Sequence, residues 1–211
     1  MSLTSGAHPV TQASIDDGYA VRIEHVVKQY SADGPIVLDD VSLDVRPGEF
    51  VSLVGASFRA KSTLLNLLAG LDTQTSGTIE TSGSPTLMFQ EAALMPWLTA
   101  GKNVELALLF RGVSRRQRKA RAQELLSLVH LDRSYGQRPH ELSGGMRQRV
   151  AIARALAQGR SILLMDEPFA ALDAIKRDLL HEELTRIWIE TGITIIFVTH
   201  DIGLAYYVSD R

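Results

Sequence analysis

Three short runs of this chain are almost entirely apolar and show no polar alternation. They are Phe50 to Val54, Ser161 to Met165 and Thr194 to Thr199. Strands of this kind are buried on both faces, which is typical of a parallel sheet covered by helices. Helical segments alternate with these runs along the chain. The pattern therefore predicts an α/β fold with a parallel-sheet core.

Two other segments alternate apolar and polar residues, as half-buried antiparallel strands do. They are Tyr19 to Val27 and Val37 to Val45, with Ser31 to Pro35 as the turn between them. Short strands are also expected at residues 77–81 and 86–89, around a turn at Ser82 to Pro85. The first part of the chain is thus expected to add antiparallel strands to the parallel core.

Helical patterns account for most of the remaining chain. A helix is expected over Ser62 to Ala69, closed by Gly70, and another over the amphipathic segment Ile175 to Glu190. Residues 99–158 read as an all-helical insert. Within it, Ser114 and Gln117 have capping-box spacing ahead of a basic stretch. We interpret that stretch, residues 115–121, as a solvated helix face rather than a nucleic-acid site.

Composition limits the class of protein. The chain has 211 residues, 45% of them hydrophobic, which fits one globular unit divided into subdomains. Its formal charge of -2 gives no bias toward nucleic acid. It contains no cysteine, and its longest apolar runs, such as Ile193 to Val198, fall short of the roughly 20 residues that span a bilayer. Residues 1–18 are interpreted as a flexible tail.

The loop between the first apolar run and its helix has the composition of a phosphate-binding loop. Residues 55–63 read Gly-Ala-Ser-Phe-Arg-Ala-Lys-Ser-Thr. In such loops backbone amides and a helix N-terminus surround the phosphates, a lysine contacts the outer phosphates, and the next hydroxyl binds magnesium. Lys61 and Ser62 occupy those two positions.

Two residues of this loop depart from the glycine-rich pattern. Ala60 precedes the lysine, and Phe58 stands where a further glycine is usual. Glycine tolerates positive φ and lets the backbone approach a phosphate closely. A left-handed conformation costs other residues about 1 to 2 kcal/mol, so the two side chains are expected to weaken nucleotide binding by roughly tenfold to several hundredfold if both positions require it.

Asp166 and Glu167 follow the apolar residues 162–165 and precede Pro168. They are expected at the carboxyl end of a parallel strand, where α/β sheets form their sites. Asp166 is suited to hold magnesium through water, and Glu167 to accept a proton from an attacking water. The pair predicts a magnesium-and-base site.

Ser143, Gly144 and Gly145 precede an alanine-rich helical run, Val150 to Ala157. Their amides and the helix dipole favour a phosphate. As a lone motif, Ser-Gly-Gly is more often a flexible loop and helix cap. Here the residues 146–149 that follow, Met-Arg-Gln-Arg, make the motif specific.

With these motifs in this order, the chain from about Tyr19 onward resembles the nucleotide-binding subunit of ATP-binding cassette (ABC) transporters. The resemblance implies a P-loop NTPase fold with a RecA-like parallel-sheet core, an antiparallel β subdomain and an all-helical signature subdomain. The corresponding ranges are one domain over residues 19–211, with core and β subdomain at 19–90 and 159–211 and the helical subdomain at 91–158.

The resemblance also implies the roles of individual residues toward ATP and Mg²⁺. Tyr30 would stack on adenine, and Gln90 would lie near magnesium and the attacking water. Asp173 would be the D-loop aspartate and His200 the switch histidine. The Walker A loop would comprise Gly55, Ala56, Ser57, Phe58, Arg59, Ala60, Lys61, Ser62 and Thr63. Without the resemblance, Tyr30 could equally be a surface aromatic, Gln90 a solvated polar residue and His200 a helix-start residue.

Partners follow from the same resemblance. The signature would be Leu142 to Gln148. A head-to-tail dimer with a second nucleotide-binding subunit, identical or not, would hold each ATP between one Walker A loop and the other subunit's signature. A membrane-spanning permease, served by a solute-binding protein, would place the chain at the cytoplasmic face of the membrane. Residues 89–91 and 94–99 are similar to importers of the nitrate, sulfonate and taurine group. In the family this region receives a coupling helix, so Trp97 either lines that groove or fills the helical subdomain's core.

Three functions remain open at this stage. The chain is an ATP-hydrolysing importer subunit, a degenerate subunit that serves as a structural or regulatory partner, or a soluble ABC ATPase of repair or translation. The family usually continues beyond the Asp-Arg pair found here at residues 210–211. On that basis the chain is expected to lack a C-terminal strand and to unfold below about 60 °C.

Overall fold

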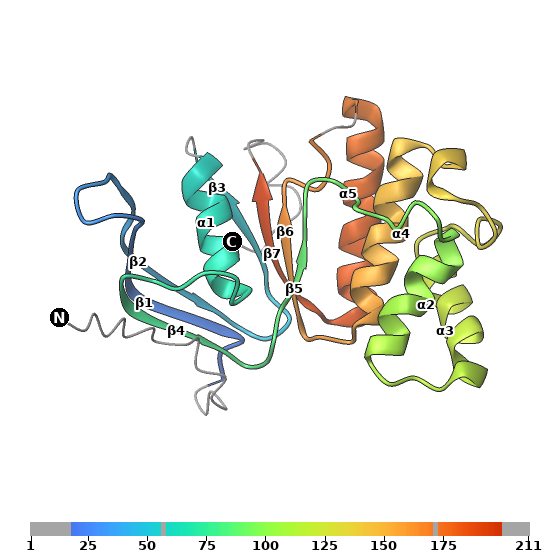
Figure 1. Ribbon diagram of the computed structural model, residues 1–211, viewed down its shortest axis with the longest axis horizontal. Helices are drawn as coiled ribbons and strands as arrows, with labels where there is room; N and C mark the ends of the chain where they lie inside the picture. The colour runs from blue at the N-terminus through green and yellow to red at the C-terminus, as the bar shows by residue number, and fades with distance from the viewer. Residues whose placement is uncertain (1–17, 56–57, 171–172, 200–211) are drawn as a thin grey trace.

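The computed structural model describes residues 18–55, 58–170 and 173–199. Two sheets organise these residues (Figure 1). One is antiparallel with strand order β2-β1-β4, and the other has four strands in the order β3-β7-β6-β5. All pairs in the second sheet are parallel. The α/β core, the antiparallel strands and the helical block expected from the sequence are therefore confirmed.

Strands and helices follow the sequence patterns closely. The strands are β1 (Val21–Gln29), β2 (Ile36–Val45), β3 (Phe50–Val54), β4 (Ser76–Thr81), β5 (Thr86–Met88), β6 (Ile162–Asp166) and β7 (Thr194–Thr199). The helices are α1 (Phe58–Leu68), α2 (Ala100–Phe110), α3 (Arg115–Leu128), α4 (Gly144–Ala157) and α5 (Ala174–Thr191), with a 3-10 turn, η1, at Pro139–Glu141. Strands β4 and β5 lie on either side of the expected turn but belong to different sheets.

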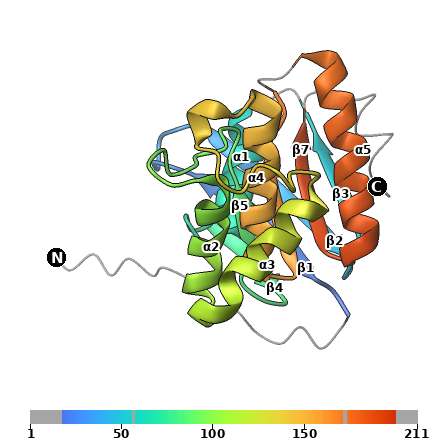
Figure 2. The same ribbon diagram turned by 90° about the vertical axis from the view of Figure 1, so that its right-hand side faces the viewer.

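Alternate residues of the parallel strands contribute to two separate cores. Leu164 of β6 and Ile196 of β7 belong to the core that contains α1 and the antiparallel sheet. Leu163 and Phe197 belong to the core that contains α4, α5 and the helical block. Figures 1 and 2 show α1 on one side of the parallel sheet and α4 and α5 on the other. Burial on both faces explains why these strands lack polar alternation.

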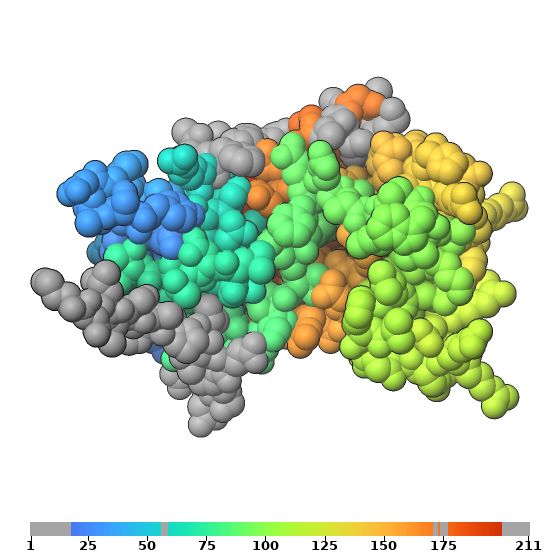
Figure 3. Space-filling view, in the orientation of Figure 1, coloured from blue at the N-terminus to red at the C-terminus, as the bar shows by residue number. Residues whose placement is uncertain are grey.

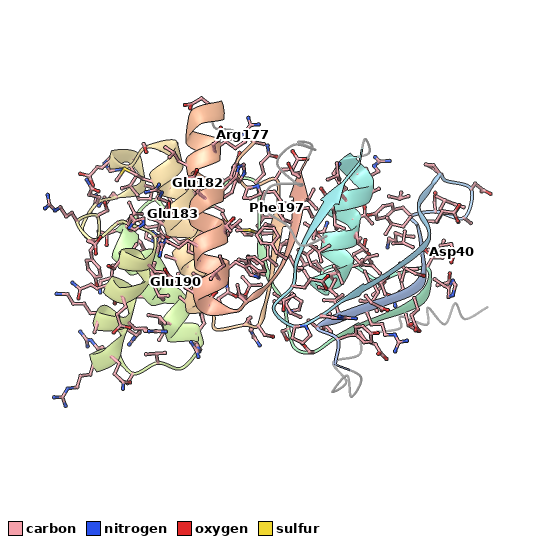
Figure 4. All side chains as sticks on the ribbon, turned by 180° about the vertical axis from the view of Figure 1, so that it is seen from behind. Asp40, Arg177, Glu182, Glu183, Glu190 and Phe197 are labelled. Atoms are coloured by element: carbon pink, nitrogen blue, oxygen red, sulfur yellow. The ribbon has the colours of Figure 1, made fainter. Side chains whose placement is uncertain are left out.

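Helices α4 and α5 are held together partly by charge. Arg149 of α4 and Glu183 of α5 form a salt bridge of 2.8 Å in which Glu183 is nearly buried. Figure 4 shows Glu183 on α5 and Phe197 on the adjacent strand β7. Burial raises the pKa of Glu183, although Arg149 opposes the shift. The contact links the helical block to the layer that covers the parallel sheet.

Two local expectations are wrong. Helix α1 begins at Phe58, not at Ser62, because residues 58–60 contain no glycine and arginine and alanine are good helix formers. The capping box at Ser114 does not form, although α3 begins where it was expected. The Ser114 hydroxyl donates to Gln117 Oε1 at 2.7 Å, so the two side chains bond each other and not the backbone.

Candidate nucleotide-binding site

The carboxyl ends of β3, β6 and β7 meet at one edge of the parallel sheet. Val54 pairs with Thr199, and Asp166 pairs with Val198. The loop that starts at Gly55 and the carboxylates at the end of β6 therefore lie at the same edge. Ala56, Ser57 and His200 lie outside the described residues. This edge is where sheets of this type bind ligands.

Lys61 and Ser62 lie within α1. Lys61 is only 7% exposed, and its Nζ donates to the carbonyl oxygen of Gly55, where β3 ends. Ser62 Oγ is buried and, among the described residues, has no hydrogen-bond partner. Lys61 therefore contacts the residue that follows β3, and the Ser62 hydroxyl oxygen is buried as well.

Tyr30 reaches α1 from the end of β1. Its hydroxyl lies 3.2 Å from Thr63 Oγ1, and Lys28 Nζ lies 4.6 Å from its ring centroid. The side chain remains 59% exposed. An exposed aromatic ring beside the residue that follows Ser62 is placed to stack on a planar ligand.

Lys28 itself is buried and paired. Its Nζ donates to Asp72 Oδ1 at 2.7 Å and to the Thr73 carbonyl at 2.6 Å. Burial would raise the pKa of Asp72, but hydrogen bonds from Lys28 and the Thr73 amide hold it below its ordinary value. The ion pair fixes the ammonium beside the Tyr30 ring, because an unpaired buried charge would be costly.

The carboxylates after β6 have distinct surroundings. Asp166 Oδ1 is buried and has no hydrogen-bond partner within the described residues. Glu167 is 9% exposed and adopts a positive φ of 45°. Its amide donates to the Val198 carbonyl at 3.1 Å, which ties it to β7. A left-handed conformation costs a residue of this type about 1 to 2 kcal/mol, and strain of this kind gathers at functional sites.

The Ser-Gly-Gly segment forms the N-terminus of α4, as the sequence predicts. Ser143 is the N-cap, and its Oγ accepts a hydrogen bond of 3.3 Å from the Met146 amide. A Cβ on Gly145 would meet only Leu180 Cδ1, at 3.9 Å, which is an ordinary contact. Packing within the described chain therefore does not require glycine at this position.

Gln90 lies after β5 and lines a cavity of about 570 Å³ together with Leu94, Gly144 and Arg147. Its side chain is exposed. The cavity thus brings Gln90 next to the start of α4. Trp97 is 69% exposed, so it does not fill the core of the helical block, and it is not among the residues that line this cavity. Asp173 is also exposed.

Sequence reasoning missed the residues that hold the segment around Gln90. Gln148 of α4 donates through Nε2 to the carbonyls of Gln90, at 2.7 Å, and Pro168, at 2.5 Å. Arg154 of α4 donates to the carbonyls of Ala92 and Ala93 at 2.8 and 2.7 Å. The sequence offered one signal for these contacts, a glutamine and an arginine on the inner side of an otherwise alanine-rich helix. Buried polar side chains need hydrogen-bond partners.

Asn103 of α2 holds the next part of the same segment and was also missed. It is fully buried. Its Oδ1 accepts from the Met95 amide at 2.8 Å, and its Nδ2 lies 3.0 to 3.3 Å from the carbonyls of Met95, Leu98 and Thr99. Side chains of the helical block therefore bind the backbone of residues 90–99 along most of its length.

Two oxygen atoms at the sheet edge are suited to bind Mg²⁺. Ser62 Oγ and Asp166 Oδ1 are buried oxygens without partners in the described chain. Oxygen ligands of this kind suit Mg²⁺, which is usually held by one or two protein oxygens together with waters and substrate phosphates. No group of three His, Cys, Asp or Glu residues that could hold a metal occurs within the described ranges. The donor set thus fits an ion shared with a phosphate ligand.

A model of the family described as ABC transporter matches residues 38–170. The chain belongs to this family. The taurine import ATP-binding protein TauB of Rhizobium johnstonii is 48% identical over 182 residues, which cover 82% of this chain and 70% of TauB. The nitrate import ATP-binding protein NrtC of Synechococcus elongatus is 45% identical over 90% of this chain.

Relatives of the NrtC kind are longer than this chain. The chain spans 31% of the length of NrtC and 31% of that of the bicarbonate transport ATP-binding protein CmpC of Synechocystis, to which it is 44% identical. A solved dimeric ATP-binding cassette in a post-hydrolysis state with ADP and Pi has a TM-score of 0.74 at 37% identity and covers 88% of this chain and 90% of its own. The P-loop NTPase fold follows from these neighbours, and so does the likeness to ATP-binding subunits of import systems.

Proposed function

We propose that this chain is the ATP-binding subunit of an importer and that ATP hydrolysis drives uptake of a small, anionic solute. The observation that carries this proposal is the sheet edge at which Lys61, Asp166 and Glu167 gather. Relatives named for nitrate, bicarbonate and taurine transport support the solute class. The chain would act beside a membrane-spanning permease; none of the described helices is long and apolar enough to cross a bilayer.

Each residue of the edge has a proposed role. Tyr30 stacks on the adenine, while Lys61 and the amides of residues 55–63 hold the phosphates. Ser62 and Asp166 supply oxygens to Mg²⁺, with Gln90 beside them. Bound there, Mg²⁺ neutralises phosphate charge. Glu167 accepts the proton of the attacking water, and His200 contacts the outer phosphate.

The start of α4 is proposed to act on a nucleotide held by another subunit. Ser143, Gly144 and Gly145 present amides at a helix N-terminus, and Asp173 lies at the same subunit boundary. The ordinary contact at Gly145 supports this role, because the glycine leaves room for a ligand from outside the chain. In this arrangement residues 91–158 form the signature-bearing helical subdomain, and residues 19–90 and 159–211 form the core and β subdomain.

A second candidate function rests on the start of α1. The helix begins at Phe58, and the ammonium of Lys61, which is nearly buried, donates to the Gly55 carbonyl. Glycine at positions 58 and 60 would make the helical conformation less favourable by about 1 kcal/mol at each position. We therefore infer that this chain's own loop binds ATP weakly, so that the chain serves mainly as the partner of an intact subunit.

The variant F58G/A60G tests both candidates. We expect it to bind Mg·ATP on the order of tenfold more tightly than the unchanged chain, since the first turn of α1 then opens more readily. Binding would be measured by calorimetry, and turnover by phosphate release. The control F110G/A120G removes the same residue types from exposed positions of the helical block. Equal affinity and turnover of F58G/A60G and the unchanged chain would refute the impaired loop.

Co-purification tests the transport assignment separately. An importer subunit is expected to remain bound to a membrane-spanning partner after mild solubilisation of the membrane. If all of the purified chain lacks such a partner, the soluble ABC ATPase of repair or translation would be favoured.

A further inference from the structure

A groove with a basic rim lies between α2 and α3, away from the sheet edge that carries Lys61. Its volume is about 440 Å³. Figure 3 shows the surface of these two helices on the right-hand side of the molecule. The groove is lined by three leucines, four cations and one carboxylate; the charged residues are Lys102 and Glu105 of α2 and Arg115, Arg118 and Lys119 of α3.

Positive charge is concentrated on this part of the molecule. Residues 102–124 contain seven Lys or Arg and two Glu, whereas the whole chain has a formal charge of -2. Arg115, Arg118 and Lys119 form no salt bridge with any residue in the described ranges. Arg118 Nε is buried without a hydrogen-bond acceptor in the same part of the chain. These cations are available to an anionic ligand.

The one carboxylate in the groove offsets only one of the four cations, so the groove keeps a net positive charge. Lys102 Nζ lies 2.7 Å from Glu105 Oε2, and the Tyr135 hydroxyl donates to Glu105 Oε1. Although burial opposes the shift, these contacts hold the pKa of Glu105 below its ordinary value. Glu105 thus orients Lys102 at the rim, while three cations of α3 keep the opposite rim positive.

Large apolar side chains project beside the same groove. Phe110, at the end of α2, is 83% exposed, and its neighbour Leu109 is 46% exposed. A solvated helix face would account for the cations but not for three leucines that line the groove together with an exposed phenylalanine next to one of them in the chain. Cations together with protruding apolar residues are typical of surfaces that bind the interface of an anionic membrane.

We propose that this groove binds the headgroup phosphate of an anionic phospholipid, while Phe110 enters the lipid interface. The volume of the groove falls in the range of small-molecule sites. A stable protein partner would need about 800 Å² of surface on each side, so a lipid fits better than an acidic peptide. The proposal concerns a direct contact with lipid and does not depend on nucleotide binding.

Vesicle flotation of the full chain tests the proposal. The chain is expected to float with vesicles of phosphatidylcholine and phosphatidylglycerol, and not with phosphatidylcholine alone. The variant R115Q/K119Q removes two rim cations and should bind on the order of tenfold to thirtyfold more weakly. The control R116Q/R121Q removes the same charge from the same helix at positions outside the groove, and it should keep most of the binding. F110S should also weaken flotation.

Several outcomes would contradict binding of an anionic phospholipid by this groove. Equal losses in the two double variants would mean that binding follows only the overall charge of α3. Equal flotation with neutral vesicles would show that the anionic headgroup is not what the chain binds. Release from vesicles by a glutamate-rich peptide at micromolar concentration would favour a protein partner. The substituted side chains are exposed, so circular dichroism should show an unchanged fold for each variant. None of these substitutions should change the affinity for ATP.

Discussion

Single side chains connect segments of the candidate nucleotide site that are distant in sequence. One Gln148 amide group donates to the carbonyls of Gln90 and Pro168, which follow β5 and β6. Gln148 is 5% exposed, so water does not readily replace these bonds. Helix α4 therefore positions both the Gln90 segment and the turn after Glu167 through one residue.

Replacing Gln148 with leucine should leave both carbonyls without a donor. We expect the free energy of unfolding to fall by about 2 to 3 kcal/mol and amide hydrogen exchange to accelerate in residues 90–93. Chemical denaturation and exchange mass spectrometry would measure the two effects. Q123L, at an exposed amide on α3, is the control. Similar changes in both variants would show that the Gln148 bonds contribute little.

The Lys28–Asp72 pair is a second residue-scale contact with a pH signature. The folded pKa of Asp72 is lowered, so the carboxylate stabilises the fold fully above its unfolded pKa of about 3.9. This contribution is lost as the pH falls through the lower, folded pKa. Asp72→Asn should therefore destabilise the protein by about 2 kcal/mol at pH 7, because Lys28 stays buried without its carboxylate.

The difference between D72N and the unchanged chain should shrink as the pH falls below about 4. Denaturation series at several pH values would measure it. D39N removes an exposed carboxylate from β2 and serves as the control. A difference that stays constant down to pH 2 would contradict the role assigned to the Asp72 charge.

Among the elements, α1 and the segment 90–99 show where sequence reasoning succeeds and fails. Apolar runs located β3 and β7 correctly to the residue, because burial on both faces leaves a continuous signal. The predicted start of α1, Ser62, is four residues late, because residues 55–63 have the composition of a phosphate-binding loop. Local helix propensity was the better guide there.

Positions of the site residues were only partly readable from the sequence. The apolar pattern predicts parallel strands and so places the ends of β3 and β6 at the same sheet edge, but the strand order comes only from the structure. The contacts of Gln148, Arg154 and Asn103 depend on how two helices pack against a loop, which no periodicity reports. Such polar contacts were visible only as buried polar residues on helical faces.

Asn103 gives an element-scale test. Asn103→Leu removes its hydrogen bonds to the segment that joins β5 to α2. We expect a loss of about 2 to 4 kcal/mol in the free energy of unfolding, with faster hydrogen exchange at residues 95–99. The exposed N-terminal half of α3 should keep its exchange rates. An unchanged exchange pattern at 95–99 would show that other contacts hold the segment.

For the whole molecule, two activities are separable in principle. The edge with Lys61 and Glu167 would serve ATP bound by this chain, and the start of α4 would serve ATP bound by a partner. The altered loop concerns only the first, so a chain with a weak site of its own could still complete the site of a neighbour. The chain belongs to the family, and the proposal that its own site is weak concerns residues 58–60 alone.

Strand order also dictates when the parallel sheet can exist during synthesis. Among the described strands, β3 pairs with β7 alone, and roughly 140 residues separate the two. At ribosomal rates of about 5 to 20 residues per second, β3 is made some 7 to 30 seconds before its partner. The antiparallel sheet, complete by Thr81, can form early. An apolar strand without a partner for that time is exposed to aggregation, so the nascent chain is a natural client for chaperones.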